Sequence, residues 1–199
     1  MKKIRVTARI TEVSNLSTVI VRLFKAEIDA NSDAGNDAFL IDTFAQLEKL
    51  STNLISAIKT DKILSNLDVA DSERDELFRE LSAALTGYAS LPFPDYQQAA
   101  SPLLSIMEKY RGLPTENYAS ESALLKSLLE DFSTPDAKAA ISLLHGIDEL
   151  IRLLTYAQDK FDQTNDEYNA ACINKTDSAT SLKKEILSLI SDRLCLPIR

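Results

Sequence analysis

Apolar residues recur three and four positions apart along most of this chain, and the most regular run lies between residues 37 and 60. The spacing puts its apolar side chains on one stripe of an α-helix that faces a core. Asp37 comes just before the run and supplies a carboxylate for an N-cap. We therefore predict a helix over 37–60, whose apolar positions are Leu40, Ile41, Phe44, Leu47, Leu50, Leu54, Ile55 and Ile58.

The same spacing predicts more helices on either side of this one. The connections between them are mostly two to eight residues long, which is typical of antiparallel neighbours in bundles. Four glycines in 199 residues leave little for hairpin turns. We predict one all-α domain over 1–199, an antiparallel helical bundle of about six to eight helices. Its other helices are expected to begin near Ser14 or Ser17, Asp71, Ser101, Ser120, Thr134, Asp148 and Thr176 or Asp177.

The N-terminus shows a different period. Ile4, Val6, Ala8 and Ile10 alternate with polar residues, and such alternation with β-branched residues indicates extended backbone. No second segment with a clear period of two follows. We therefore expect an extended N-terminal arm over about 1–13 that lies across the helices.

Charge and apolar run length restrict the partners and the compartment. The net charge of −8 disfavours nucleic acid as a partner, because phosphate contacts need clustered Lys and Arg. No run approaches the roughly 20 apolar residues that span a bilayer, and the basic start leads into polar residues rather than a secretory apolar stretch. Cys172 and Cys195 could pair with each other, but one pair in a chain of this size is no disulfide framework. We expect a cytoplasmic protein with no nucleic-acid or membrane partner.

Several short motifs over residues 63–168 resemble one family. They are ADSERDELF at 70–78, QAASPLL at 98–104, MEKYRG at 107–112, YASE at 118–121 and LHGI at 144–147. Their order and spacing are similar to those of a bacterial family of helical proteins of unknown function, found mostly in gut anaerobes. The chain departs from that pattern at Leu16-Ser17-Thr18 and at Tyr168. The resemblance implies a helical bundle and no assigned activity.

The chain lacks the residues of common enzymatic sites. His145 is the only histidine, and Ser at 142 excludes the Glu-x-x-His motif of di-iron bundles. A Cys172–His145 dyad is unreachable, because the predicted helix over 148–172 separates the two residues along its length. The loop after Asp29 lacks the glycine and glutamate of a calcium loop. We predict no catalytic residue, no cofactor and no metal.

The best polar constellation is Asp71, Arg74 and Asp75. In a functional reading, it would hold a carboxylate or phosphate. In the structural reading, which we favour, Asp71 caps a helix and Arg74 pairs with a carboxylate of a neighbouring helix.

The surplus of apolar residues leads to the functional hypothesis. Phe39 and Ile55 fall to the side of the main apolar stripe over 37–60. Such residues form an interface if they lie at the surface. We therefore predict a non-catalytic module that binds a protein partner or forms a homo-oligomer. The alternative is a small-ligand carrier whose cavity between helices is lined by Met107 and tyrosines.

Overall fold

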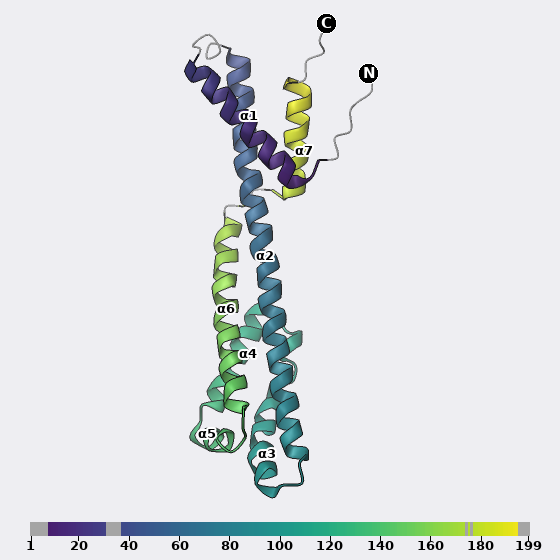
Figure 1. Ribbon diagram of the computed structural model, residues 1–199, viewed down its shortest axis with the longest axis vertical. Coiled ribbons are helices and arrows are strands. Elements are labelled where there is room, and N and C mark those ends of the chain that lie inside the picture. The colour runs from purple at the N-terminus through teal and green to yellow at the C-terminus, as the bar shows by residue number, and fades with distance from the viewer. Residues whose placement is uncertain (1–7, 31–36, 174, 176, 195–199) are drawn as a thin grey trace. The chain divides into compact units, whose positions relative to one another are not determined.

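The computed structural model describes residues 8–30, 37–173, 175 and 177–194 (Figure 1). Over these residues the chain is helical and contains no strand, so the predicted all-α fold is confirmed. Two short elements, η2 (Leu113–Thr115) and the π-helical turn η3 (Ile190–Leu194), accompany the α-helices. The seven α-helices are α1 (Ile10–Ala30), α2 (Ala38–Ser90), α3 (Pro94–Lys109), α4 (Tyr118–Phe132), α5 (Pro135–Ile141), α6 (Ile147–Ile173) and α7 (Ala179–Leu189).

The chain divides into two compact units. Unit 1 combines both ends of the sequence, Met1–Ile63 and Asn169–Arg199, whereas unit 2 is the continuous segment Leu64–Tyr168. Helix α2 contributes residues to both units. The organisation as one domain over 1–199 stays a prediction.

Helix α2 is a single helix of 53 residues (Figure 1). Its start is the predicted one, since the Asp37 carboxylate accepts the backbone N–H groups of Phe39 and Leu40 at 2.9 and 3.1 Å. The predicted break before Asp71 is wrong, and Asp71 lies inside the helix rather than at its N-cap. Residues 59–71 contain neither glycine nor proline, so nothing in the segment ends the helix.

Helix α1 begins earlier than the sequence predicts. The extended arm is not confirmed, because residues 10–13 are already helical and residues 1–7 lie outside the described part of the chain. The backbone N–H of Arg9 donates to the Glu12 carboxylate at 2.7 Å, a bond that closes the first turn. Ile10 and Val13 are three residues apart and therefore also fit a helix. The alternation over residues 4–10 favoured extended backbone instead.

Two proline signals give different outcomes. Pro135 opens α5 as predicted, with Thr134 at the N-cap. Pro102, however, lies inside α3, which begins at Pro94 instead of Ser101. Helix α4 also begins before its predicted cap, since Asn117 caps it by accepting the Ser120 N–H at 3.1 Å.

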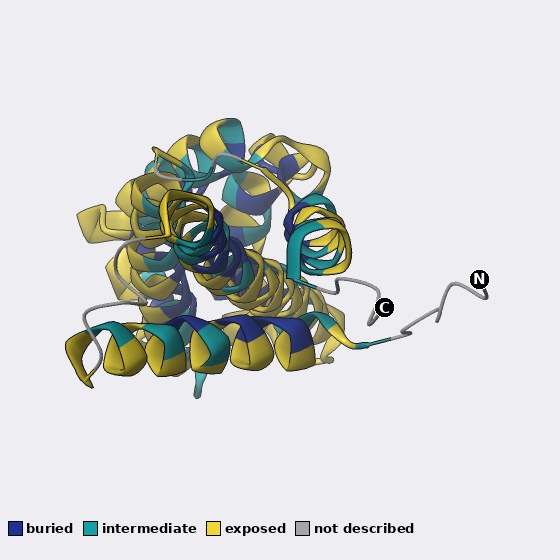
Figure 2. Cartoon of the chain, turned by 90° about the horizontal axis from the view of Figure 1, so that it is seen from above, coloured by how far each residue is buried: buried dark blue, intermediate teal, exposed yellow. Residues whose placement is uncertain are grey.

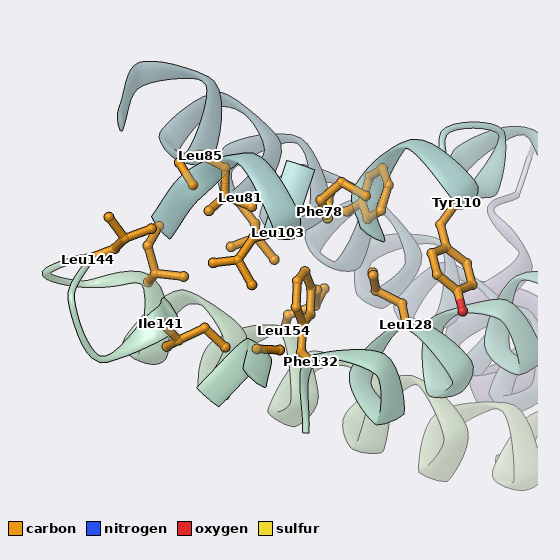
Figure 3. Packing of buried hydrophobic residues seen from close by; sticks show 14 of the residues in the cluster. Phe78, Leu81, Leu85, Leu103, Tyr110, Leu128, Phe132, Ile141, Leu144 and Leu154 are labelled. Atoms are coloured by element: carbon orange, nitrogen blue, oxygen red, sulfur yellow. The ribbon is translucent and has the colours of Figure 1, made fainter. Parts of the chain in front are cut away.

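Each unit has its own apolar core. In unit 1, α1 and α2 supply Val13, Val21, Leu47 and Leu54, and α7 supplies Leu182 and Ile186. The core of unit 2 is formed by side chains from the helices α2 through α6, and the side chains labelled in Figure 3 point toward one another. It includes Phe78, Leu81, Leu85, Leu103, Tyr110, Leu128, Phe132, Ile141, Leu144 and Leu154.

Two glycines are expected to respond to substitution with opposite signs. Gly146, which precedes α6, has a φ of 84°, and a Cβ there meets no atom within 4 Å. Gly146→Ala should therefore lower the free energy of unfolding by about 1 kcal/mol through backbone conformation alone. Gly87 lies in α2 with equal space around it, so Gly87→Ala should raise the free energy by roughly 0.5–1 kcal/mol. Urea titrations of both variants measure the two shifts, and a shared sign contradicts this account.

Candidate functional site

The most connected polar group in the described chain is Arg74, in the unit 2 part of α2. Its side chain has no exposed surface. The guanidinium Nη2 lies 2.7 Å from a carboxylate oxygen of Asp71 and 2.7 Å from Glu121 Oε2 in α4. Its Nη1 donates at 3.0 Å to the Ser122 hydroxyl. Nη1 also donates at 3.0 Å to the Gln158 amide oxygen in α6. One side chain therefore connects three helices of unit 2.

Three polar residues of this cluster occupy core positions. Arg74 follows Leu67 and Ala70 and precedes Phe78 on the buried stripe of α2. Glu121 stands four residues before buried Leu125, and Gln158 lies between buried Leu154 and Phe161. We call Arg74, Glu121 and Gln158 the polar layer.

An aromatic ring and a second set of bonds surround the polar layer. The Arg74 guanidinium carbon lies 3.9 Å from the centre of the Phe161 ring, within the range of cation–π attraction. The Gln158 amide donates to Asp162 at 2.8 Å, and Lys126 pairs with Asp162 at 2.7 Å. The polar layer is thus tied on one side to charges at the surface.

Glu121 carries an unusual proton affinity. Burial raises its pKa to about 7, opposed by the Arg74 guanidinium and assisted by the Asp71 and Asp75 carboxylates and a hydrogen bond to Asp75. Glu121 Oε1 and Asp75 Oδ1 are buried, and neither accepts a hydrogen bond from a donor among the described residues. Because two ionised carboxylates can only accept, a proton on Glu121 supplies the donor that joins them.

A tyrosine lies at the edge of the same cluster. The Tyr118 hydroxyl donates to Asp68 at 3.1 Å, and its ring meets Phe161 edge to face with centres 5.2 Å apart. Burial and the bond to Asp68 raise the pKa of Tyr118 to about 12. Tyr118 therefore stays neutral and donates at physiological pH.

The structure brings together only part of the predicted constellation. Arg74 pairs with Asp71 and, as expected, with a carboxylate of a neighbouring helix. Asp75 instead pairs with Arg79 at 3.1 Å and faces Glu121. Sequence reasoning missed Glu121 and Gln158, although a polar residue within an apolar stripe is a readable signal of a buried polar contact.

The other candidate residues lie apart from this cluster. Exposed His145 uses its carbonyl to accept the Tyr88 hydroxyl at 2.8 Å. Tyr110 bonds to Ser127 and Asp131 at 2.9 and 3.1 Å. These hydroxyls are therefore directed to protein groups. Cys172 is a free thiol of intermediate exposure, and Cys195 lies outside the described residues.

One surface hollow of unit 2 lies away from the polar layer. A groove of about 420 Å³ runs beside α2 and α3, lined by Phe78, Met107 and Leu104 together with Arg79, Glu108 and Arg111. Arg79 pairs with Asp75 in α2, and Arg111, which follows α3, pairs with Glu108 in α3. The groove therefore offers no uncommitted charge at these positions. Within the described part of the chain, no helix combines the length and apolarity needed to cross a bilayer.

The three side chains of the polar layer are all buried in unit 2. Arg74 has no exposed surface, so a ligand cannot reach its guanidinium unless the helices separate. Buried polar residues at core positions are known to fix the register of packed helices. The structural reading of Arg74 and its acids stays a prediction, apart from the Asp71 cap, which is wrong.

Comparisons with known proteins identify a family. A family model described as "Family of unknown function (DUF6261)" matches residues 64–192. This match contains the motifs from ADSERDELF to LHGI and extends the earlier resemblance to residue 192. The bacterial source and the gut anaerobes stay a prediction. No curated protein and no solved structure matches the chain.

Proposed function

Because this chain belongs to the family of unknown function DUF6261, we propose its function from its own surface: it is a non-catalytic helical module that binds protein through unit 1. The observation that carries the proposal is a group of exposed apolar side chains on α1. Leu16, Val19 and Leu23 are 51%, 40% and 61% exposed. Contiguous exposed apolar surface is typical of protein interaction sites.

Helix α2 adds two more exposed apolar side chains to unit 1. Phe39 and Ile55, which fall beside the main apolar stripe, are about half exposed. Arg193 approaches the Phe39 ring at 5.5 Å and pairs with Asp42 at 2.8 Å. The residues on α1 and on this part of α2 precede residue 64, where the family match begins. We propose that this segment supplies the contact with a partner, in the cytoplasm.

Photo-cross-linking from a single position tests the proposed function. A photoreactive amino acid is placed at Leu23 in the full chain and expressed in the native cells. We expect an adduct to a protein at Leu23. The matched control is Leu143 in unit 2, which is 59% exposed and should give no specific adduct. Equal labelling from both positions, or none from Leu23, contradicts a binding surface on unit 1.

A further inference from the structure

The exposed apolar residues of α1 follow a regular repeat. Leu16, Val19, Leu23, Ala26 and Ala30 are spaced three, four, three and four residues apart, and all are exposed. We call these five residues the outer stripe. Buried Val13 and Val21, with Ser14 and Ser17, lie on the other side of the helix, on the order of 140° away at about 100° per residue. In Figure 2, the helix joined to the trace marked N is buried along one side and exposed along the other.

A repeat of 3.5 residues is the spacing of a coiled-coil seam. With Leu16 and Leu23 at a positions, Val19 and Ala26 take d positions. In proteins, a helix gains most of its stability from tertiary packing of its apolar side. Helix α1 is already held by its inner side, where Val13 and Val21 join the core of unit 1. Pairing through the outer stripe therefore costs little further conformational entropy of α1.

The charges beside the outer stripe indicate what can pair with it. Arg22 takes a g position, and Glu27 takes the following e position; both are exposed. In a parallel coiled coil, each g residue faces the e residue five positions later in the other helix. Arg22 of one copy would then face Glu27 of a second copy, twice by symmetry. Neither residue forms an ion pair with another residue that the structure describes.

We propose that a second copy of this chain packs its own α1 in parallel against the outer stripe, with Arg22 of each copy facing Glu27 of the other. The inference rests on the proposed function, because it names the partner of the same surface. It uses a self-complementary face, as two-fold symmetric dimers do.

Sedimentation velocity of the purified full chain over a concentration series tests the pairing. The wild-type chain is expected to form dimers of twice 22.0 kDa. Leu23→Glu should weaken the dimer by about 100-fold, because two buried seam contacts become charged. The matched control Leu143→Glu should leave the dimer unchanged. Melting curves check that each variant is folded. If Leu23→Glu does not fold, Leu16→Glu replaces it as the test variant.

Charge exchange tests the parallel arrangement without touching the apolar seam. Arg22→Glu and Glu27→Arg should each weaken the dimer by about tenfold or more, since both symmetric pairs become repulsive. The double variant should regain the wild-type affinity within about threefold, and an equal mixture of the two single variants should form mixed dimers. Failure of the double variant to recover overturns the parallel pairing.

The two proposals can fail separately. A wild-type chain that stays monomeric overturns pairing with a second copy. If Leu23 then cross-links to a different protein in cells, the proposed function stands with that protein as the partner. If Leu23 cross-links to nothing, both proposals fail. A dimer unaffected by Leu23→Glu also overturns the inference, because its interface lies elsewhere.

Discussion

Replacing Arg74 with methionine is expected to lower the free energy of unfolding by about 3–5 kcal/mol. At pH 8, where Glu121 is ionised because its pKa is about 7, the variant leaves this buried carboxylate without its guanidinium partner. It also removes the donors to Ser122 and Gln158. Asp71 loses its partner as well, but its side chain is 26% exposed and can be solvated. The urea dependence of helical circular dichroism measures the change.

Two further variants separate a buried pair from an ordinary surface charge. Arg79→Met removes an arginine that is 64% exposed and pairs with Asp75, so its cost should be no more than about 1 kcal/mol. Replacing the polar layer together, as Arg74→Met with Glu121→Leu and Gln158→Leu, should recover most of the stability lost by Arg74→Met. If the triple variant is less stable than the single one, the loss does not come from uncompensated buried charge.

The stability of unit 2 is expected to decrease as the pH rises from about 4.5 to about 7. In the folded chain the pKa of Glu121 is about 7, against 4.5 as its ordinary value, so the folded state binds the additional proton in this interval. The contribution is fully present below pH 4.5 and is lost as the pH passes through 7. Its size is on the order of 3 kcal/mol, from roughly 1.4 kcal/mol per pKa unit.

Glu121→Gln isolates this contribution from the titration of other acids. The amide is neutral at every pH, can donate to Asp75 and can still accept from Arg74. Unfolding free energies of both chains are compared between pH 4.5 and 8. The wild-type chain should lose on the order of 3 kcal/mol relative to the variant across this range. Parallel profiles would show that Glu121 holds no proton in the folded chain.

The start of a helix was predictable where a single local sequence signal was sufficient to locate it. Apolar spacing and the Asp37 carboxylate located the start of α2, and Thr134-Pro135 located the start of α5. The break before Asp71 was wrong because a side chain that can cap a helix also fits inside one when no glycine or proline intervenes. Ser101-Pro102 failed for a related reason, since α3 had already started at Pro94.

The polar layer was only partly predictable. The charge of Arg74 within an apolar stripe indicated a carboxylate partner, and the partner exists. Its identity as Glu121 depends on the register between α2 and α4, which no local pattern contains. The raised pKa of Glu121 requires in addition that two acids from different helices meet in a buried place. These properties arise from packing and not from spacing along the chain.

The division of the chain into a continuous and a discontinuous unit has a consequence for its synthesis on the ribosome. All of unit 2 has been made when residue 168 is added, so its core can form while translation continues. Unit 1 is completed later, because α1 packs against α7, whose Leu182 and Ile186 are made only after unit 2 is complete. Helix α1 therefore keeps the side that carries Val13 and Val21 uncovered until α7 has been made. We expect nascent chains stopped before α7 to expose α1 to chaperones and proteases after unit 2 has become resistant.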